Sequence, residues 1–125
     1  MSDFSAEKYA TVQKVVSRKS FVIQIQISNM IDLKNMTITK ARKALDERVF
    51  SAVDLASAYL TEIKNKNKEL NAYLEVYDDV LLQAKMADER IAKGESYPLL
   101  GIPLAIKDNI LIKGRRASSA SKILE

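Results

Sequence analysis

The chain of 125 residues contains neither cysteine nor histidine. The lack of cysteine excludes disulfide bonds, thiolate nucleophiles and cysteine-ligated zinc sites. The lack of histidine removes the side chain that most often serves as a general base near neutral pH. Acid-base chemistry in this chain must therefore use lysine, aspartate, glutamate or tyrosine.

Long hydrophobic runs are also absent. No apolar stretch approaches the roughly 20 residues needed to span a bilayer. The first ten residues, MSDFSAEKYA, lack the basic-then-apolar pattern of a secretory signal. We therefore expect no membrane partner and a cytoplasmic location.

The composition that remains is typical of a globular protein. Apolar residues make up 47% of the chain and charged residues 29%, which is enough apolar surface for one modest core or part of a larger one. The net charge of +4 is spread along the chain, so no basic arm indicates a nucleic-acid partner.

The chain divides into two parts with different patterns. In residues 1–35, Ser5 can begin a short helix, and the alternating segment FVIQIQI, Phe21–Ile27, predicts a strand. From Met36 the pattern becomes mostly helical. We therefore treat residues 1–35 as an extension of unknown role and residues 36–125 as the second unit.

Capping signals predict two helices after Met36. Thr39 can cap a short helix over residues 40–47, and Ser51 with Asp54 resembles a capping box. The longer helix that follows places five apolar residues on one face: Ala52, Leu55, Ala56, Tyr59 and Ile63. Three lysines near its C-terminal end, Lys64, Lys66 and Lys68, suit the helix dipole.

The next elements predict an α/β architecture. Leu70–Tyr77 is typical of a strand, and Asp78 and Asp79 are well placed to begin a helix that ends at Lys93 and Gly94. A second apolar strand then begins near Ile102 or Leu104, since Pro103 cannot donate to a ladder. Strand, helix and strand in this order favour a parallel pairing.

Three polar residues, Lys107, Asp108 and Asn109, directly follow the second predicted strand. Active sites of α/β proteins commonly lie at the carboxyl ends of strands. A lysine that is shielded from water there favours its neutral amine form and can act as a base. The alternative is that Lys107 simply begins an exposed turn.

A serine-rich stretch follows in residues 117–121. Its hydroxyl and backbone N–H groups can cap a helix, bind an anion or join a polar network. The basic residues before it, Lys113, Arg115 and Arg116, can contact phosphate or lie in a solvated loop. The pair Asp78 and Asp79 could in principle bind a metal or perform acid-base work, but a helix start explains it better, and we predict no metal site.

The motif GIPLAIKDNI, Gly101–Ile110, followed by a small hydroxyl-rich stretch and ASKILE, resembles the amidase signature enzymes. Within them it is similar to the A subunits of the amidotransferases that act on glutamyl-tRNA(Gln) and aspartyl-tRNA(Asn). The resemblance covers Met36–Glu125. It implies an α/β fold with a mixed central sheet flanked by helices, of which this chain is the N-terminal part.

The resemblance also implies a catalytic triad of a serine, a second serine in a cis peptide and a lysine. Lys107 matches the lysine, which is the base when the serine attacks the amide of glutamine. Asp108 and Asn109 match supporting residues, and Ser121 matches a serine with a structural or hydrogen-bonding role. Two threonines of the family are replaced here by Ala117 and Ser118.

In such enzymes ammonia travels to a B subunit, which uses ATP and Mg to amidate the misacylated tRNA, while a C subunit wraps the pair. We expect no cofactor on this chain itself. The segment with the catalytic serines is missing from the sequence, so we expect an enzyme piece that is inactive alone. Residues 1–35 have no counterpart and are interpreted as upstream sequence read in frame. The alternatives are a stand-alone amidase for a small amide and a non-catalytic binding module.

Overall fold

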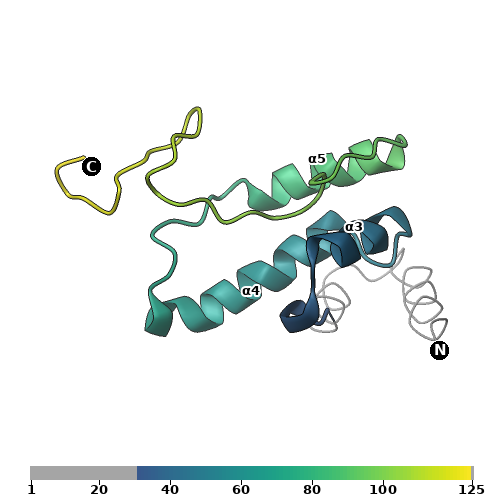
Figure 1. The fold of residues 1–125 in the computed structure, drawn as a ribbon, viewed down its shortest axis with the longest axis horizontal. Coiled ribbons are helices and arrows are strands. Elements are labelled where there is room, and N and C mark those ends of the chain that lie inside the picture. Colours follow the sequence, from purple (N-terminus) through teal and green to yellow (C-terminus); the bar gives the residue numbers. More distant parts are fainter. Residues whose placement is uncertain (1–30, 125) are drawn as a thin grey trace.

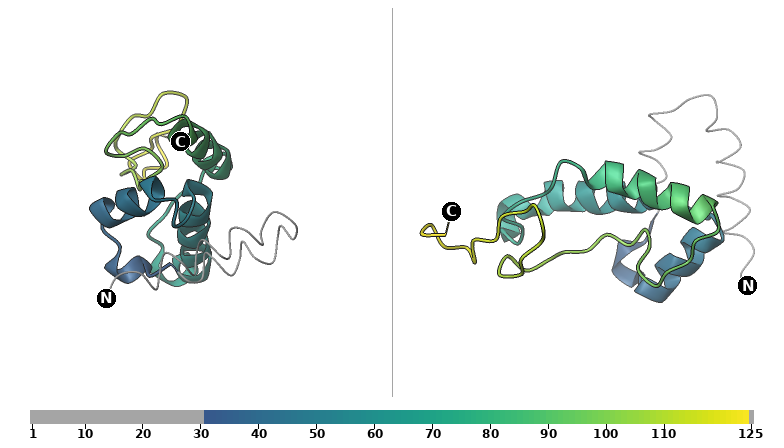
Figure 2. Two further views of the ribbon diagram at one scale, coloured as in Figure 1. Left: turned by 90° about the vertical axis from the view of Figure 1, so that its right-hand side faces the viewer. Right: turned by 90° about the horizontal axis from the view of Figure 1, so that it is seen from above.

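The structure, a computed structural model, describes residues 31–124 (Figure 1). These residues form the short 3-10 helix η1 (Leu33–Asn35) and the helices α3 (Ile38–Asp46), α4 (Ala52–Leu70) and α5 (Val80–Ala92). Helix α5 packs against α4, and α3 lies near the first half of α4 (Figure 2). The predicted helix at Ser5 and the predicted strand Phe21–Ile27 lie outside the described residues.

The core lies where α3 meets the beginning of α4. Seven buried apolar side chains form it: Ile31, Ala41, Leu45, Phe50, Ala52, Leu55 and Ala58. Ile31 precedes the predicted boundary at Met36, yet its side chain is only 8% exposed and belongs to this core. The side chains of Ala84, Ala87 and Ile91 from α5 pack against the cluster.

Helix α3 begins two residues earlier than the sequence predicts. The N-cap is Thr37, whose hydroxyl oxygen accepts a hydrogen bond from the backbone N–H of Lys40 at 3.2 Å. Thr39 was the wrong cap because it lies inside the helix. Both threonines carry a hydroxyl suited to capping, so residue type alone does not distinguish them.

Helix α4 begins with the predicted capping box. The Ser51 hydroxyl accepts from the Asp54 backbone N–H, and the Asp54 carboxylate accepts from the Ser51 backbone N–H at 2.9 Å. Asp88 of α5 adds a tertiary contact, since its carboxylate accepts from the N–H groups of Ala52 at 2.6 Å and Val53 at 3.2 Å. The start of α4 is therefore held locally and by α5.

We expect Ser51→Ala to lower the free energy of unfolding by about 1–2 kcal/mol, because the orphan N–H of Asp54 loses its acceptor. Ser57→Ala is the matched control, since Ser57 lies inside the same helix, where alanine is at least as favourable as serine. Urea unfolding followed by circular dichroism measures both. Equal effects of the two substitutions would contradict a stabilising role for the cap.

Helix α4 ends at Leu70, with Asn71 in the left-handed conformation at φ 48°. Asparagine tolerates this conformation better than most residues. The side chain of Asn67 then holds the following segment, because its amide exchanges two hydrogen bonds with the backbone of Tyr73, at 2.8 and 2.9 Å. The chain therefore leaves α4 in a fixed direction.

The two predicted strands do not form within residues 31–124. Leu70 belongs to α4, and the segments 71–77 and 102–107 lack regular secondary structure. No backbone hydrogen bond joins these two described segments to each other. A strand exists only when a neighbour completes its ladder, so an apolar alternating pattern alone does not create one.

After α5 the chain turns at Lys93 and Gly94, as predicted, and runs back beside α5 toward the end of the molecule away from α3 (Figures 1 and 2). The buried guanidinium of Arg42 fixes this return by donating to the backbone oxygen of Leu100. Within the described part of the chain, no helix is long and apolar enough to cross a membrane.

Candidate functional site

Lys107 lies in a turn closed by a hydrogen bond from the Ile110 N–H to the Lys107 backbone oxygen at 2.9 Å. The side chain is exposed and lines an open hollow of about 430 Å³. The walls of this hollow come from the two segments that were predicted as strands, together with the residues that follow the second one: Ala72, Tyr73, Leu74, Glu75, Tyr77, Ala105, Ile106, Asp108, Ile110, Ile112 and Arg116.

Asp108 ties this turn to the serine-rich stretch. Its Oδ2 accepts hydrogen bonds from the Ser118 hydroxyl at 2.7 Å, the Ser118 N–H at 3.2 Å and the Ala120 N–H at 2.9 Å. Its backbone oxygen accepts from the Ser119 N–H at 3.3 Å. One carboxylate therefore fixes the distance between the lysine turn and residues 118–120.

The turn at Ser118–Ser121 has an unusual backbone. It is closed by a 2.8 Å hydrogen bond from the Ser121 N–H to the Ser118 oxygen. Its central residues, Ser119 and Ala120, have φ of 50° and 55°, which is costly for residues with a Cβ. The hydrogen bonds from Ser118 and Ala120 to Asp108 compensate for this cost.

The structure thus places the four predicted site residues in two turns that Asp108 links. Lys107 and Asp108 line the same hollow, and Ser121 is half-buried in the turn that Asp108 holds. Asn109 is exposed in the lysine turn. Whether these four residues take part in catalysis stays a prediction.

Ser118 was not among the predicted site residues, yet it is only 6% exposed and its hydroxyl donates directly to Asp108. Of the interpretations of the serine-rich stretch, helix capping is wrong for residues 117–121, since no helix begins there. The polar network is the interpretation that the contacts of Ser118 confirm. The ten-residue separation from Asp108 gave no local signal for this pairing.

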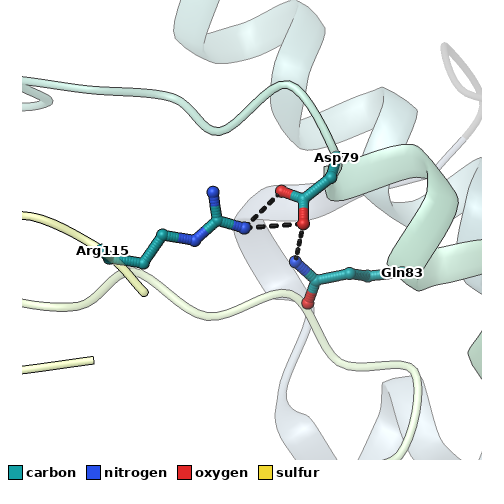
Figure 3. Close-up of polar contacts among 3 residues, drawn as sticks. All are labelled: Asp79, Gln83 and Arg115. Atoms are coloured by element: carbon teal, nitrogen blue, oxygen red, sulfur yellow. Dashed lines mark hydrogen bonds and ion pairs between the residues drawn. The ribbon is translucent and has the colours of Figure 1, made fainter. Parts of the chain in front are cut away.

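A second set of contacts joins the loop to α5 (Figure 3). Arg115 Nη2 lies 2.6 Å from both carboxylate oxygens of Asp79, and Gln83 donates to Asp79 at 3.0 Å. The guanidinium also stacks on the ring of Tyr77, 4.1 Å from its centre. Asp79 occupies the predicted N-cap position of α5, but its side chain makes no capping hydrogen bond.

These contacts shift the protonation equilibria of both carboxylates. Hydrogen bonds from the Ala120 N–H and the Ser118 hydroxyl hold the pKa of Asp108 below its ordinary value. The Arg115 guanidinium, with help from Gln83, lowers the pKa of Asp79 in the same way. Both groups are therefore ionised at neutral pH and serve as acceptors.

The pKa shift of Asp108 predicts an acid transition of the loop. Because the folded pKa lies below the unfolded value of about 3.9, the stabilisation is complete above that pH and is lost as the pH falls through the folded pKa. We expect the amide proton shifts of Ser118 and Ala120, followed by NMR, to titrate together with a midpoint below about 3.9. Asp108→Asn should abolish this titration, and a midpoint above about 3.9 in the unsubstituted chain would contradict it.

Among residues 31–124, no group of three or more acidic side chains is arranged to hold a metal ion, and the sequence offers no cysteine or histidine. Within the acidic pair, Asp79 occupies the N-cap position of α5 and forms an ion pair with Arg115. The arrangement offers instead an amine, Lys107, on a loop held by a carboxylate and an ion pair.

The comparisons with known proteins agree with the motif at this loop. The model of the amidase family matches residues 54–125, more than half of the chain, and the chain therefore belongs to the amidase family.

The curated relatives that match the chain share a name that is narrower than the family. The chain is 44% identical over 96 residues to the A subunit of glutamyl-tRNA(Gln) amidotransferase from Ruminiclostridium cellulolyticum, covering 76% of this chain and 20% of that relative. It is 47% identical over 96 residues to the protein of the same name from Rhodopseudomonas palustris strain TIE-1, covering 76% and 19%. The counterpart from Neisseria meningitidis serogroup C is 46% identical over 90 residues, covering 71% and 19%.

The chain spans about a fifth of the length of these relatives. No solved structure matches the chain significantly.

Proposed function

We propose that this chain supplies Lys107 as the general base of a glutamine-hydrolysing site in a tRNA-dependent amidotransferase. The observation that carries this proposal is the identity of 44% and 47%, over three quarters of the chain, to proteins named as the A subunit of glutamyl-tRNA(Gln) amidotransferase. The geometry supports it, because Lys107 lies on a loop that Asp108 and Ser118 hold in place.

In the proposed reaction a serine hydroxyl outside residues 1–125 attacks the side-chain amide carbon of glutamine. A second serine, also outside these residues, passes the proton of the attacking hydroxyl to the neutral amine of Lys107. The carbon–nitrogen bond breaks, the proton returns to the leaving nitrogen, and ammonia departs. Water then hydrolyses the acyl ester and releases glutamate. Asp108, Asn109 and Ser121 keep the loop and its lysine in place.

A lysine base requires a site with little water, and in this chain Lys107 is exposed. We infer that further polypeptide covers it. The surface around the loop is suited to this, since many large apolar side chains are exposed: Leu74, Val76, Leu104, Ile106, Ile110 and Leu111. Neighbouring strands would turn the segments 71–77 and 102–107 into part of the mixed α/β sheet that the family resemblance implies.

The proposal extends to the partners of the enzyme. The released ammonia would pass to a B subunit that uses ATP and Mg to amidate a misacylated glutamyl- or aspartyl-tRNA, with a C subunit completing a heterotrimer. The chain itself would bind no cofactor. The complex would act in the cytoplasm during protein synthesis.

The competing function within the same family is that of a stand-alone amidase for a small amide, which the general amidase family match also fits. Glutaminase assays on the complete enzyme separate the two functions. Hydrolysis that rises when the B subunit and tRNA are added supports the amidotransferase. Rapid hydrolysis of small amides that is independent of both supports the stand-alone enzyme. A gene that lacks the serine-bearing segment would indicate a non-catalytic module.

A further inference from the structure

Arg115 joins the Lys107 loop to the helical body of the protein. It belongs to the segment that follows the lysine turn, while its two partners, Asp79 and Tyr77, lie at the beginning of α5 and just before it. The partners are 36 and 38 residues away in sequence, so the contact closes a long loop of chain. Figure 3 shows the guanidinium pointing out of the loop toward the first turn of α5.

The contact is made of two interactions that reinforce each other. The ion pair places Arg115 Nη2 2.6 Å from each oxygen of Asp79, and stacking places the guanidinium carbon 4.1 Å from the centre of the Tyr77 ring. Gln83, one turn into α5, donates to the same carboxylate at 3.0 Å and keeps it turned toward the arginine. A planar guanidinium can satisfy both partners at once, whereas an ammonium cannot.

Tyr77 connects this contact to the lysine. It lines the same hollow as Lys107 and Asp108, and together with Arg115 it also lines a second hollow of about 800 Å³ along α5. Asp108 then links the lysine turn to Ser118, three residues after Arg115. Asp108 therefore links two parts of the loop to each other, and Arg115 links the loop to the start of α5.

We propose that Arg115, bound to Asp79 and stacked on Tyr77, is a positioning residue that sets the place of the Lys107 loop relative to α5 and so orients the lysine amine for amide hydrolysis. This inference rests on the proposed amidase function. Arg115 does not touch the substrate; it acts through the loop. The role differs from that of Asp108, which fixes the internal shape of the loop but not its place on the body.

The test compares Arg115→Met with Arg90→Met in the complete amidotransferase. Arg90 is a matched control because it makes the same kind of contact at the other end of α5, pairing with Glu95 at 2.7 Å and stacking 5.5 Å from the centre of the Tyr97 ring. We expect Arg115→Met to lower kcat for glutamine hydrolysis by about 10- to 100-fold, with KM for glutamine within about twofold of wild type. Arg90→Met should leave both nearly unchanged.

Two further readouts separate positioning from a general loss of structure. Activity with free ammonia should be unchanged in Arg115→Met, because ammonia bypasses the amidase site. Hydrogen exchange of peptides covering residues 107–121 should become faster in Arg115→Met and not in Arg90→Met. If Arg115→Met does not fold, Arg115→Lys decides: it keeps the charge but loses the planar fork, so a lowered kcat and faster exchange are still expected.

The outcomes also distinguish this inference from the proposed function. Wild-type kcat and unchanged exchange in Arg115→Met would overturn the positioning role, and so would an equal loss of glutamine- and ammonia-dependent activity. If Lys107→Ala retains glutaminase activity, the proposed function fails. The exchange measurement still reports whether Arg115 holds the loop.

Discussion

Replacing Lys107 by alanine in the complete enzyme is expected to lower glutamine hydrolysis by at least about 1,000-fold, because the serine nucleophile then has no base. Amidation with free ammonia should stay close to the wild-type rate, since ammonia does not need the amidase site. Both activities are measured on one preparation, so the second activity shows that the variant is folded and assembled.

The matched control is Lys113→Ala, which removes a lysine from the same loop. Lys113 is exposed and lies outside the hollow that Lys107 lines. We expect its glutaminase activity to stay within about twofold of wild type, as is usual for a surface substitution. Retention of glutaminase activity by Lys107→Ala would remove Lys107 from the catalytic role.

The largest expected loss of stability comes from Gly101→Ala. Gly101 has φ of 79°, and a Cβ placed on it would lie 3.1 Å from Ala52 Cβ and from Leu45 Cδ1. Both neighbours belong to the buried core between α3 and α4, so neither moves easily. Backbone strain and overpacking together should lower the free energy of unfolding by about 2–4 kcal/mol.

Gly94→Ala measures the backbone-strain part of this effect without the steric part. Gly94 has a similar φ of 88°, but apart from its two chain neighbours no residue lies within 4 Å of the place where its Cβ would be. We expect a loss of only about 1 kcal/mol there, from backbone strain alone. Urea unfolding of both variants measures the difference, and equal losses would show that Gly101 is not tightly packed.

The helices were predictable because their signals are local. The capping box at Ser51 and Asp54 involves residues three positions apart, and the glycine stop after α5 is equally short in range. The cap of α3 was misplaced by two residues, since Thr37 and Thr39 offer the same hydroxyl. Local chemistry therefore predicts the presence of a helix more reliably than it predicts the residue at which the helix begins.

The strands and the loop contacts depend on partners that are distant in sequence. The segments 71–77 and 102–107 have the composition of strands, but the ladder that would define them is not formed among residues 31–124. Likewise, nothing near Arg115 indicates that it binds Asp79, 36 residues earlier. The motif around Lys107 predicts a site at this loop, whereas the contacts of Asp108, Ser118 and Arg115 required the structure.

The most direct test of the central claim is to remove the amine at position 107 and then restore it chemically. The chain contains no cysteine, so Lys107→Cys introduces one thiol into it, and 2-bromoethylamine converts that thiol to an amine of nearly the length of lysine. The account predicts that the Lys107→Cys enzyme lacks glutaminase activity and regains a substantial part of it after modification, while treated Lys107→Ala enzyme stays inactive. Full modification of residue 107 without any recovery of glutamine hydrolysis would contradict the assignment of Lys107 as the base.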